Sequence, residues 1–210
     1  MKVLNLYAGI GGNRKLWEGV DVTAVERDPE IAQVYSDNFP EDTVVVGDAH
    51  EYLRENFDDY DFIWSSPPCP THSRFRRDMH GWDKPVYPDM KLWQEIIFLE
   101  GMHSGEYVVE NVIPYYEPLR EGQERGRHMF WSSFYIPTVA HLDIAADGVK
   151  RQDASYEELE ENYGFDLGGY GFDRRRKRKM LNNCVQPKLG KHIFDAATKN
   201  RQLTIGQLTP

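Results

Sequence analysis

The chain has 210 residues, enough for one α/β domain with a sizeable core or for one domain with a small insert. Its formal net charge of −9 argues against a large non-specific nucleic-acid surface but is compatible with a local basic groove. The two cysteines lie far apart and form no CxxC pair, which excludes a disulfide framework and indicates a reduced protein. Without a signal peptide or a long apolar span, we expect a cytoplasmic protein, in a bacterium or a virus-infected host, with no membrane contact and no metal.

The first predicted unit is a strand, a glycine loop and a helix. Val3 to Tyr7 is a short apolar run typical of a buried strand. Residues 8–12, Ala-Gly-Ile-Gly-Gly, follow directly, and residues 13–20 are expected to form a helix with Leu16 and Trp17 facing inward. Glycines between a strand and a helix let the backbone approach a ligand closely. Because the full G-x-G-x-x-G pattern is missing, a tight turn without a ligand is the alternative.

Acidic residues follow the next two predicted strands. Residues 22–25 form a strand ending in Glu26, near the position where nucleotide-binding folds place an acid for ribose hydroxyls. Asp28-Pro29 fits the cap and first residue of a helix. Residues 43–46 form a third strand, followed by Asp48. We interpret both acids as facing a ligand at one edge of the sheet, although an Asp after a strand is often only a helix cap.

The fourth predicted strand, residues 61–64, ends in two serines and the run Pro67-Pro68-Cys69-Pro70. Proline fixes its own φ and restricts the residue before it, so the backbone is stiff on both sides of the Cys69 thiol. A rigid loop at a strand end holds a nucleophile in a fixed position relative to the sheet. The alternative is a proline-rich turn with an inert, buried cysteine.

The next segments carry a further carboxylate and two arginines. A helix over residues 91–103 and a strand over 107–109 place Glu110 at the strand end beside the cysteine loop. Two arginines, Arg125 and Arg127, then lead into an aromatic run that reads as one or two strands, and alternation along a strand would put both cations on one face. The alternative is a solvated charge pair.

Periodicity weakens between residues 137 and 172, and the glycine-rich residues 164–171 are expected to form a loop. The basic run 174–179 is either a solvated helix face or a contact to phosphates. A helix is predicted over residues 188–199. The alternation of strands and helices indicates an α/β fold with a doubly wound, mostly parallel, Rossmann-like sheet.

Taken in order, these motifs resemble those of the DNA cytosine-5 methyltransferase family. The segment 6–12, Leu-Tyr-Ala-Gly-Ile-Gly-Gly, is similar to its cofactor loop, Pro68-Cys69 to its nucleophile motif and Glu110-Asn111-Val112 to its Glu-Asn-Val. Residues 123–127, Gln-x-Arg-x-Arg, resemble its arginine motif, and residues 182–185, Asn-Asn-Cys-Val, its Gly-Asn-Ala-Val. The match runs from residue 3 to about residue 200.

The resemblance implies an S-adenosylmethionine-dependent methyltransferase fold and methyl transfer to carbon 5 of cytosine in double-stranded DNA, with S-adenosylhomocysteine as product. The base would flip out of the duplex, and a thiolate would add to its carbon 6. The implied catalytic residues are Cys69, Glu110, Arg125 and Arg127, with Arg127 lowering the pKa of the thiol. The implied cofactor site comprises Tyr7, Ala8, Gly9, Gly11, Gly12, Glu26, Arg27, Asp48, Ala49, Pro68, Leu92 and Asn183. The expected nucleic-acid contacts are Ser73, Arg74, Arg76, Arg174, Arg175, Arg176 and Lys177.

Three positions depart from the family pattern: Pro70 stands in place of a Gln, Asn182 in place of a Gly, and Arg27 where an aromatic residue often packs on the adenine. Full-length members also carry a target-recognition domain where this chain has only a short stretch. We therefore predict a short member with a catalytic core over residues 1–137, a minimal target-recognition region over 138–180 and a C-terminal segment over 181–210 that returns to the core. A protein partner would then supply target recognition.

Three other functions compete with this interpretation. The same chemistry acts on a base in RNA, including tRNA, and the short recognition region removes the main argument for DNA. A non-catalytic, methyltransferase-like binding module is a second alternative, but such a module has no need of Cys69, Glu110 and Arg127 together. A Rossmann-like dehydrogenase is a third, and it does not explain the prolines around the cysteine.

Overall fold

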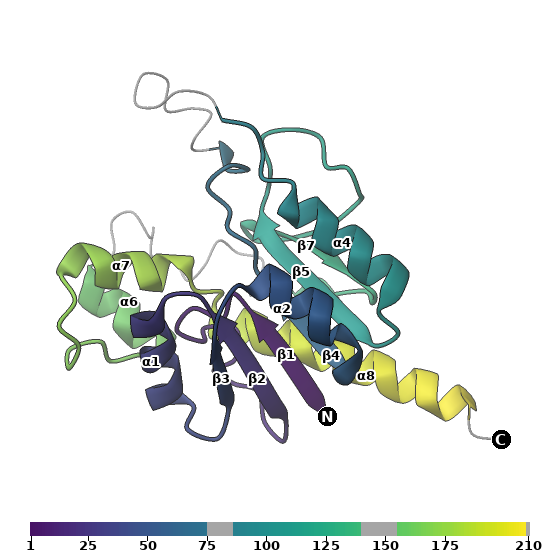
Figure 1. The fold of residues 1–210 in the computed structure, drawn as a ribbon, viewed down its shortest axis with the longest axis horizontal. Helices are drawn as coiled ribbons and strands as arrows, with labels where there is room; N and C mark the ends of the chain where they lie inside the picture. Colours follow the sequence, from purple (N-terminus) through teal and green to yellow (C-terminus); the bar gives the residue numbers. More distant parts are fainter. Residues whose placement is uncertain (75–85, 140–154, 209–210) are drawn as a thin grey trace.

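A seven-stranded sheet organises the chain (Figure 1). The computed structural model describes residues 1–74, 86–139 and 155–208. The strand order is β3-β2-β1-β4-β5-β7-β6, with β1 to β5 parallel and β7 antiparallel to both of its neighbours. The predicted doubly wound, mostly parallel sheet is thereby confirmed. The strands are β1 (Lys2–Leu6), β2 (Asp21–Glu26), β3 (Thr43–Val46), β4 (Phe62–Ser65), β5 (Glu106–Val112), β6 (Gln123–Arg125) and β7 (His128–Ser132).

Helices cover both faces of the sheet because its central strands are apolar on both sides. Leu4 and Leu6 of β1 face α2 (Ala49–Asn56) and α4 (Lys91–Met102), whereas Val3 on the opposite face packs in the cluster of α8 (Pro187–Leu208). Figure 1 shows α8 passing behind the sheet and α2 and α4 in front of it. A short 3₁₀ helix, η1 (Phe57–Asp59), leads from α2 to β4.

Helix α1 (Pro29–Asn38) begins as its sequence predicts. The Asp28 side chain accepts hydrogen bonds from the Glu30 and Ile31 amides, and Pro29 occupies the first turn. The strands and helices expected over residues 22–25, 43–46, 61–64, 91–103, 107–109 and 188–199 are also present, with ends that shift by a few residues and α8 running on to Leu208.

The region between the catalytic core and the C-terminal segment contributes two helices to the same fold. Helices α6 (Tyr156–Tyr163) and α7 (Arg174–Asn183) bury Leu159, Leu181 and their neighbours against α1. The described part of residues 138–180 therefore shares a hydrophobic cluster with the glycine loop, β2 and α1. Helix α6 was not expected from periodicity, although Ser155 and Glu158 form a capping box at its start.

The prediction of a helix over residues 13–20 is wrong, because the chain forms turns and no helix there. Trp17 is buried as expected, but Leu16 is 41% exposed. The physical reason lies in the C-terminal helix. Phe194 of α8 stacks on Trp17 at 5.0 Å between ring centroids, and the Trp17 indole donates to the Gly190 carbonyl at 3.2 Å. Helix α8 thus covers the part of the sheet that a helix after β1 would otherwise occupy.

Candidate active site

The glycine loop after β1 is pressed against the C-terminal segment. Tyr7, Gly9 and Gly11 all have positive φ, at 55°, 57° and 86°, so the chain turns sharply where the strand ends. At Gly12 a Cβ atom would lie 2.6 Å from the Val185 carbonyl oxygen and 2.8 Å from the Cys184 Cβ. Gly12 is therefore required by close packing, whereas the site of a Cβ on Gly9 is open, with nothing within 4 Å.

Glu26, at the end of β2, holds this loop in place through a hydrogen bond. One of its carboxylate oxygens accepts from the Gly9 amide and the other from the Asp28 amide, both at 2.9 Å. Each oxygen keeps a second lone pair for a ligand hydroxyl. The predicted ribose contact of Glu26 is thus compatible with a structural role that the sequence alone did not reveal.

Asp48 caps α2 by accepting from the His50 and Glu51 amides, and it lies 3.7 Å from the Lys91 ammonium. Burial alone would raise the pKa of the Asp48 carboxyl, but the two amides and Lys91 hold it below its ordinary value. Asp48 is therefore a helix cap, as the alternative proposed, and its contact to a cofactor stays a prediction.

The other predicted cofactor residues fall into two groups. Ala8, Ala49 and Leu92 are buried in the core, the last two between the sheet and the helices α2 and α4. Arg27, Pro68 and Asn183 are exposed near the ends of β2, β4 and α7. Their contacts to a cofactor stay predictions.

A buried carboxylate that sequence reasoning missed lies behind the glycine loop. Glu95 of α4 is 1% exposed and accepts from the Tyr7 and Ser65 hydroxyls, both at 2.5 Å, and pairs with the His50 ring at 2.9 Å. Burial and the adjacent Glu95 charge raise the pKa of the Tyr7 phenol far above its ordinary value. The burial of Glu95 could have been predicted from the sequence, because Glu95 lies on the face of the helix 91–103 that carries the apolar residues.

The cysteine loop after β4 is anchored on both sides of the thiol. Before it, the Asn111 amide donates to the Pro67 carbonyl at 2.9 Å. After it, the Cys69 carbonyl accepts from the amides of His72 and the next residue, at 3.0 and 3.2 Å. The Thr71 hydroxyl accepts from the Asp89 amide at 2.9 Å. The nucleophile candidate is thus held by contacts from β5 and from the segment before α4, in addition to its two prolines.

His72 fixes the far end of this loop from inside the protein. It is fully buried, and its Nδ1 lies 2.6 Å from the Tyr116 hydroxyl, which also accepts from the Trp93 indole at 3.1 Å. Burial lowers the pKa of His72, so its ring is neutral at physiological pH.

The charges of Glu110 and Arg127 both act on the Cys69 thiol. Cys69 is half-buried, and Glu110 is buried on β5, the parallel neighbour of β4. Burial and the Glu110 charge raise the pKa of the Cys69 thiol, and Arg127 only partly opposes them. Arg127 therefore acts in the expected direction, but the net shift is upward and the resting thiol is protonated at neutral pH.

The Glu110 carboxylate is held by several donors. Burial alone would raise its pKa, but His128, Ser66 and Arg127 reverse the effect and hold the pKa below its ordinary value. The His128 Nδ1 hydrogen-bonds one carboxylate oxygen. The Ser66 hydroxyl donates to the same carboxylate and accepts from the Trp64 indole at 2.9 Å. Neither His128 nor Ser66 belongs to the motifs identified from the sequence.

The two arginines of the Gln-x-Arg-x-Arg motif do not share one strand face. Gly126, at φ 60°, turns the chain between them, so Arg125 closes β6 and Arg127 precedes β7. Arg125 is buried and donates to the carbonyls of Glu124 and Ile136. It therefore ties the hairpin to the segment that follows it. Its predicted catalytic role has no support in these contacts.

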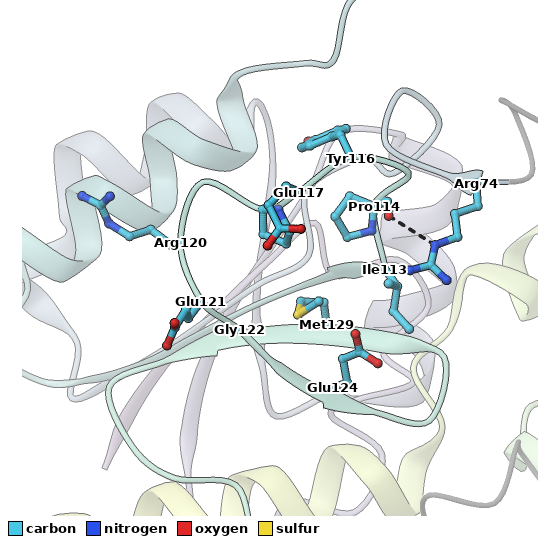
Figure 2. Close-up of a pocket in the computed structure, with 11 residues that line it drawn as sticks. Arg74, Ile113, Pro114, Tyr116, Glu117, Arg120, Glu121, Gly122, Glu124 and Met129 are labelled. Carbon is cyan, nitrogen blue, oxygen red and sulfur yellow. Dashed lines mark hydrogen bonds between the residues drawn. The ribbon is translucent and has the colours of Figure 1, made fainter.

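A pocket of about 360 Å³ opens beyond the end of β5, beside the predicted nucleic-acid contacts (Figure 2). Arg74 lines it and donates from Nε to the Pro114 carbonyl at 3.3 Å. Ser73 forms an isolated bridge with the same proline. Figure 2 shows Arg74 and Glu124 on one side of the pocket, with Arg120 and Glu121 across from them. Arg76 lies outside the described residues.

The basic run of α7 is partly used by the fold. Arg176 is half-buried, pairs with Asp28 at 2.9 Å and Glu30 at 2.5 Å, and places its guanidinium 4.6 Å from the centre of the Phe172 ring. Arg176 thus holds α7 to the start of α1, and its expected phosphate contact stays a prediction. Arg174 is exposed and pairs with Glu157 at 2.7 Å. For Arg174, for the exposed Arg175 and for Lys177, which lies over the Tyr156 ring, phosphate contact stays a prediction.

Within residues 1–74, 86–139 and 155–208, no group of three metal-ligating side chains is arranged to hold an ion. In the same ranges, no helix combines the length and the apolar character that crossing a bilayer requires.

Residues 1–99 match the family model of C-5 cytosine-specific DNA methylases. These residues include the glycine loop, both strand-end acids and the cysteine loop, but not Glu110 or Arg127. No curated protein is significantly similar in sequence to the chain.

One solved structure shares the fold over nearly the whole chain, and others match parts of it. A methyltransferase from Entamoeba histolytica, EhMeth, superposes with a TM-score of 0.59 at 11% identity, over 95% of this chain and 98% of that chain. A DNMT2 mutant from Spodoptera frugiperda is 26% identical over 53% of this chain and 35% of its own, with a TM-score of 0.37. A putative DNA modification methyltransferase from an Escherichia coli prophage is 24% identical over 56% of this chain and 33% of its own, with a TM-score of 0.38.

Proposed function

We propose that the protein is a short DNA cytosine-5 methyltransferase that moves a methyl group from S-adenosylmethionine to carbon 5 of a flipped-out cytosine. The observation that carries the proposal is that the anchored Cys69 loop follows β4 while the Glu110 carboxylate lies on the neighbouring parallel strand β5, where its charge and that of Arg127 act on the thiol. The match of residues 1–99 to the DNA methylase model supports the same conclusion.

A cysteine suits this reaction because carbon 5 of cytosine is a poor nucleophile. Addition of a thiolate to carbon 6 gives carbon 5 enamine character, so that carbon 5 can attack the methyl group. Once the methyl group has been transferred, a base removes the proton of carbon 5, the carbon 5–carbon 6 double bond forms again and the thiolate leaves. The anchored loop supplies the fixed position that such an addition needs.

The resting charges define the proton movement. The thiol holds a proton and Glu110 is ionised. Formation of the sulfur–carbon 6 bond requires the thiolate, and the negative charge that develops on the ring is neutralised by a proton at ring nitrogen N3. The net change is therefore the transfer of one proton from sulfur to N3, and Glu110 is the base beside the thiol that accepts and then releases it.

The residues at the ends of β1, β2 and β3 fit S-adenosylmethionine. Gly9 leaves open space at the loop, and Glu26 keeps lone pairs for ribose hydroxyls. Asp48 lies at the end of the next strand. The cofactor would supply a methyl group on a sulfonium, which is an electrophile that needs no activation by the protein.

The test is methyl transfer from radiolabelled S-adenosylmethionine to duplex DNA and, in parallel, to RNA. An oligonucleotide carrying 5-fluorocytosine should trap a covalent complex, because fluorine blocks the loss of the carbon 5 proton. Peptide mapping should place the adduct on Cys69. The Cys69→Ser variant should lose nearly all turnover, while the Cys184→Ser variant is the matched control.

Adduct formation on Cys184, or full activity of Cys69→Ser, would contradict the mechanism. Label in RNA alone would favour an RNA cytosine-5 methyltransferase. If activity with DNA appears only in a cell extract, the predicted protein partner for target recognition gains support.

A further inference from the structure

His128 is buried beside Glu110 and has no assigned role. It opens β7, where it lies opposite Val112, while Glu110 lies opposite Phe130. Cross-strand partners share a face of the sheet, so the side chains of Glu110 and His128 are diagonal neighbours on one face. Their hydrogen bond is therefore built into the strand register.

The proton positions in this contact follow from its chemistry. The Arg127 guanidinium has no acceptor, and its Nε lies 3.0 Å from the His128 Nε2. Nε2 must therefore be unprotonated and accept. The ring proton then lies on Nδ1, which donates to the Glu110 carboxylate. The chain of donors runs from Arg127 through His128 to Glu110.

The chain of donors continues to the C-terminal segment. Arg127 also donates from a terminal nitrogen to the Asn182 carbonyl at 3.1 Å, close to the end of α7. A carbonyl at a helix C-terminus carries a partial negative charge, which favours a guanidinium there. Arg127 is thus oriented from one side by α7, and it fixes the His128 ring from the other.

We propose that His128 is a positioning residue for Glu110 in the methyl transfer described above, on which this inference rests. His128 takes one lone pair of one carboxylate oxygen, so that lone pairs remain on the carboxylate for the ring of the target base. It also keeps the resting carboxylate ionised, ready to accept a proton. The groups that face Glu110 are His128 on β7, Arg127 in the preceding turn, and Ser66 and Cys69 in the loop after β4.

The first test does not depend on activity. Ring ¹⁵N chemical shifts of His128 at pH 8 should show a protonated Nδ1 and an unprotonated Nε2 in the wild-type protein. In Arg127→Ala, the preference for this tautomer should weaken. A proton on Nε2, or a doubly protonated ring, would overturn the proposal whatever the protein catalyses.

The second test measures turnover against pH. His128→Ala removes a charge-assisted donor, so methyl transfer should fall about tenfold to a hundredfold. The acidic limb of the pH–rate profile should move to higher pH, because Glu110 then ionises less readily. His128→Asn should restore much of the rate, since its amide can replace the Nδ1 donor. His192→Ala removes a histidine that binds the Pro137 carbonyl away from the site and should change neither quantity.

Two controls separate positioning from a general effect on the fold. In a Glu110→Gln background, His128→Ala should cost less than about twofold, because its target is already altered. Binding of S-adenosylmethionine should be unchanged in His128→Ala. An equal loss in both backgrounds, or a rate loss with an unmoved pH profile, would refute the positioning role. A wild-type protein with the expected tautomer but no methyl transfer would instead refute the proposed function.

Discussion

Replacing Gly12 with alanine tests whether the C-terminal segment is packed directly on the glycine loop. The new methyl group would lie 2.6 Å from the Val185 carbonyl oxygen and 2.8 Å from the Cys184 Cβ. Ordinary contacts to such atoms are longer by roughly 0.5–1 Å, and both neighbours are backbone or backbone-attached atoms that cannot rotate away. Gly12 has no positive φ, so the cost is steric alone.

Overpacking of this kind costs about 1–3 kcal/mol in free energy of unfolding. For a chain of this size, that corresponds to a fall in Tm of about 2–12 °C. We expect Gly12→Ala to show this loss in thermal and urea unfolding followed by circular dichroism, together with weaker binding of S-adenosylmethionine.

The matched control is Gly101→Ala, in the last turn of α4, where a Cβ meets nothing within 4 Å. There the alanine should stabilise the helix by about 0.5–1 kcal/mol. A Gly12→Ala protein that unfolds at or above the wild-type midpoint would refute the packing argument.

Three further predictions concern other residues. The raised pKa of Cys69 means that its alkylation by iodoacetamide should be slow at pH 7 and should accelerate about tenfold per pH unit up to that pKa, as followed by mass spectrometry; a rate independent of pH would show a resting thiolate. Glu95→Ala should cost about 3–5 kcal/mol in urea unfolding, because it leaves the buried donors of Tyr7 and Ser65 unpaired, and a loss below about 1 kcal/mol would contradict the network. Arg176→Ala should lower stability only slightly in urea unfolding, since its pairs are partly exposed, and should leave the salt dependence of DNA binding unchanged; a weaker salt dependence would return Arg176 to the phosphate contacts.

Much of the fold was predictable because the sheet is buried on both faces. Mostly apolar runs such as Val3–Leu6 and Phe62–Trp64 indicate strands without information on the segments around them. The short helix-like stretch around Leu16 could not be judged in this way. Whether it forms a helix depends on α8, which is distant in sequence and covers that part of the sheet.

The site residues that belong to a sequence motif could be predicted. Those that reach the site only through the pairing of strands could not. Cys69 follows β4, and Glu110 lies toward the end of the neighbouring parallel strand β5, so the expected order of strands and motifs already puts them near the same edge of the sheet. His128 is recognisable only from the antiparallel register of β5 and β7, which no local pattern encodes. Arg125 belongs to a sequence motif, but its side chain does not take the predicted place. A turn at Gly126 directs it to the Ile136 carbonyl.

The contact between the glycine loop and the C-terminal segment also sets the order of events during synthesis. Gly12 is made well before Cys184 and Val185, which pack against it in the folded protein. At 5–20 residues per second, the delay is roughly 10–35 s. During that interval the nascent chain exposes Trp17 and the apolar face of β1 without their covering helix. The nascent chain is thus exposed to aggregation during that interval, and the glycine loop can reach its packed state only after α8 has emerged.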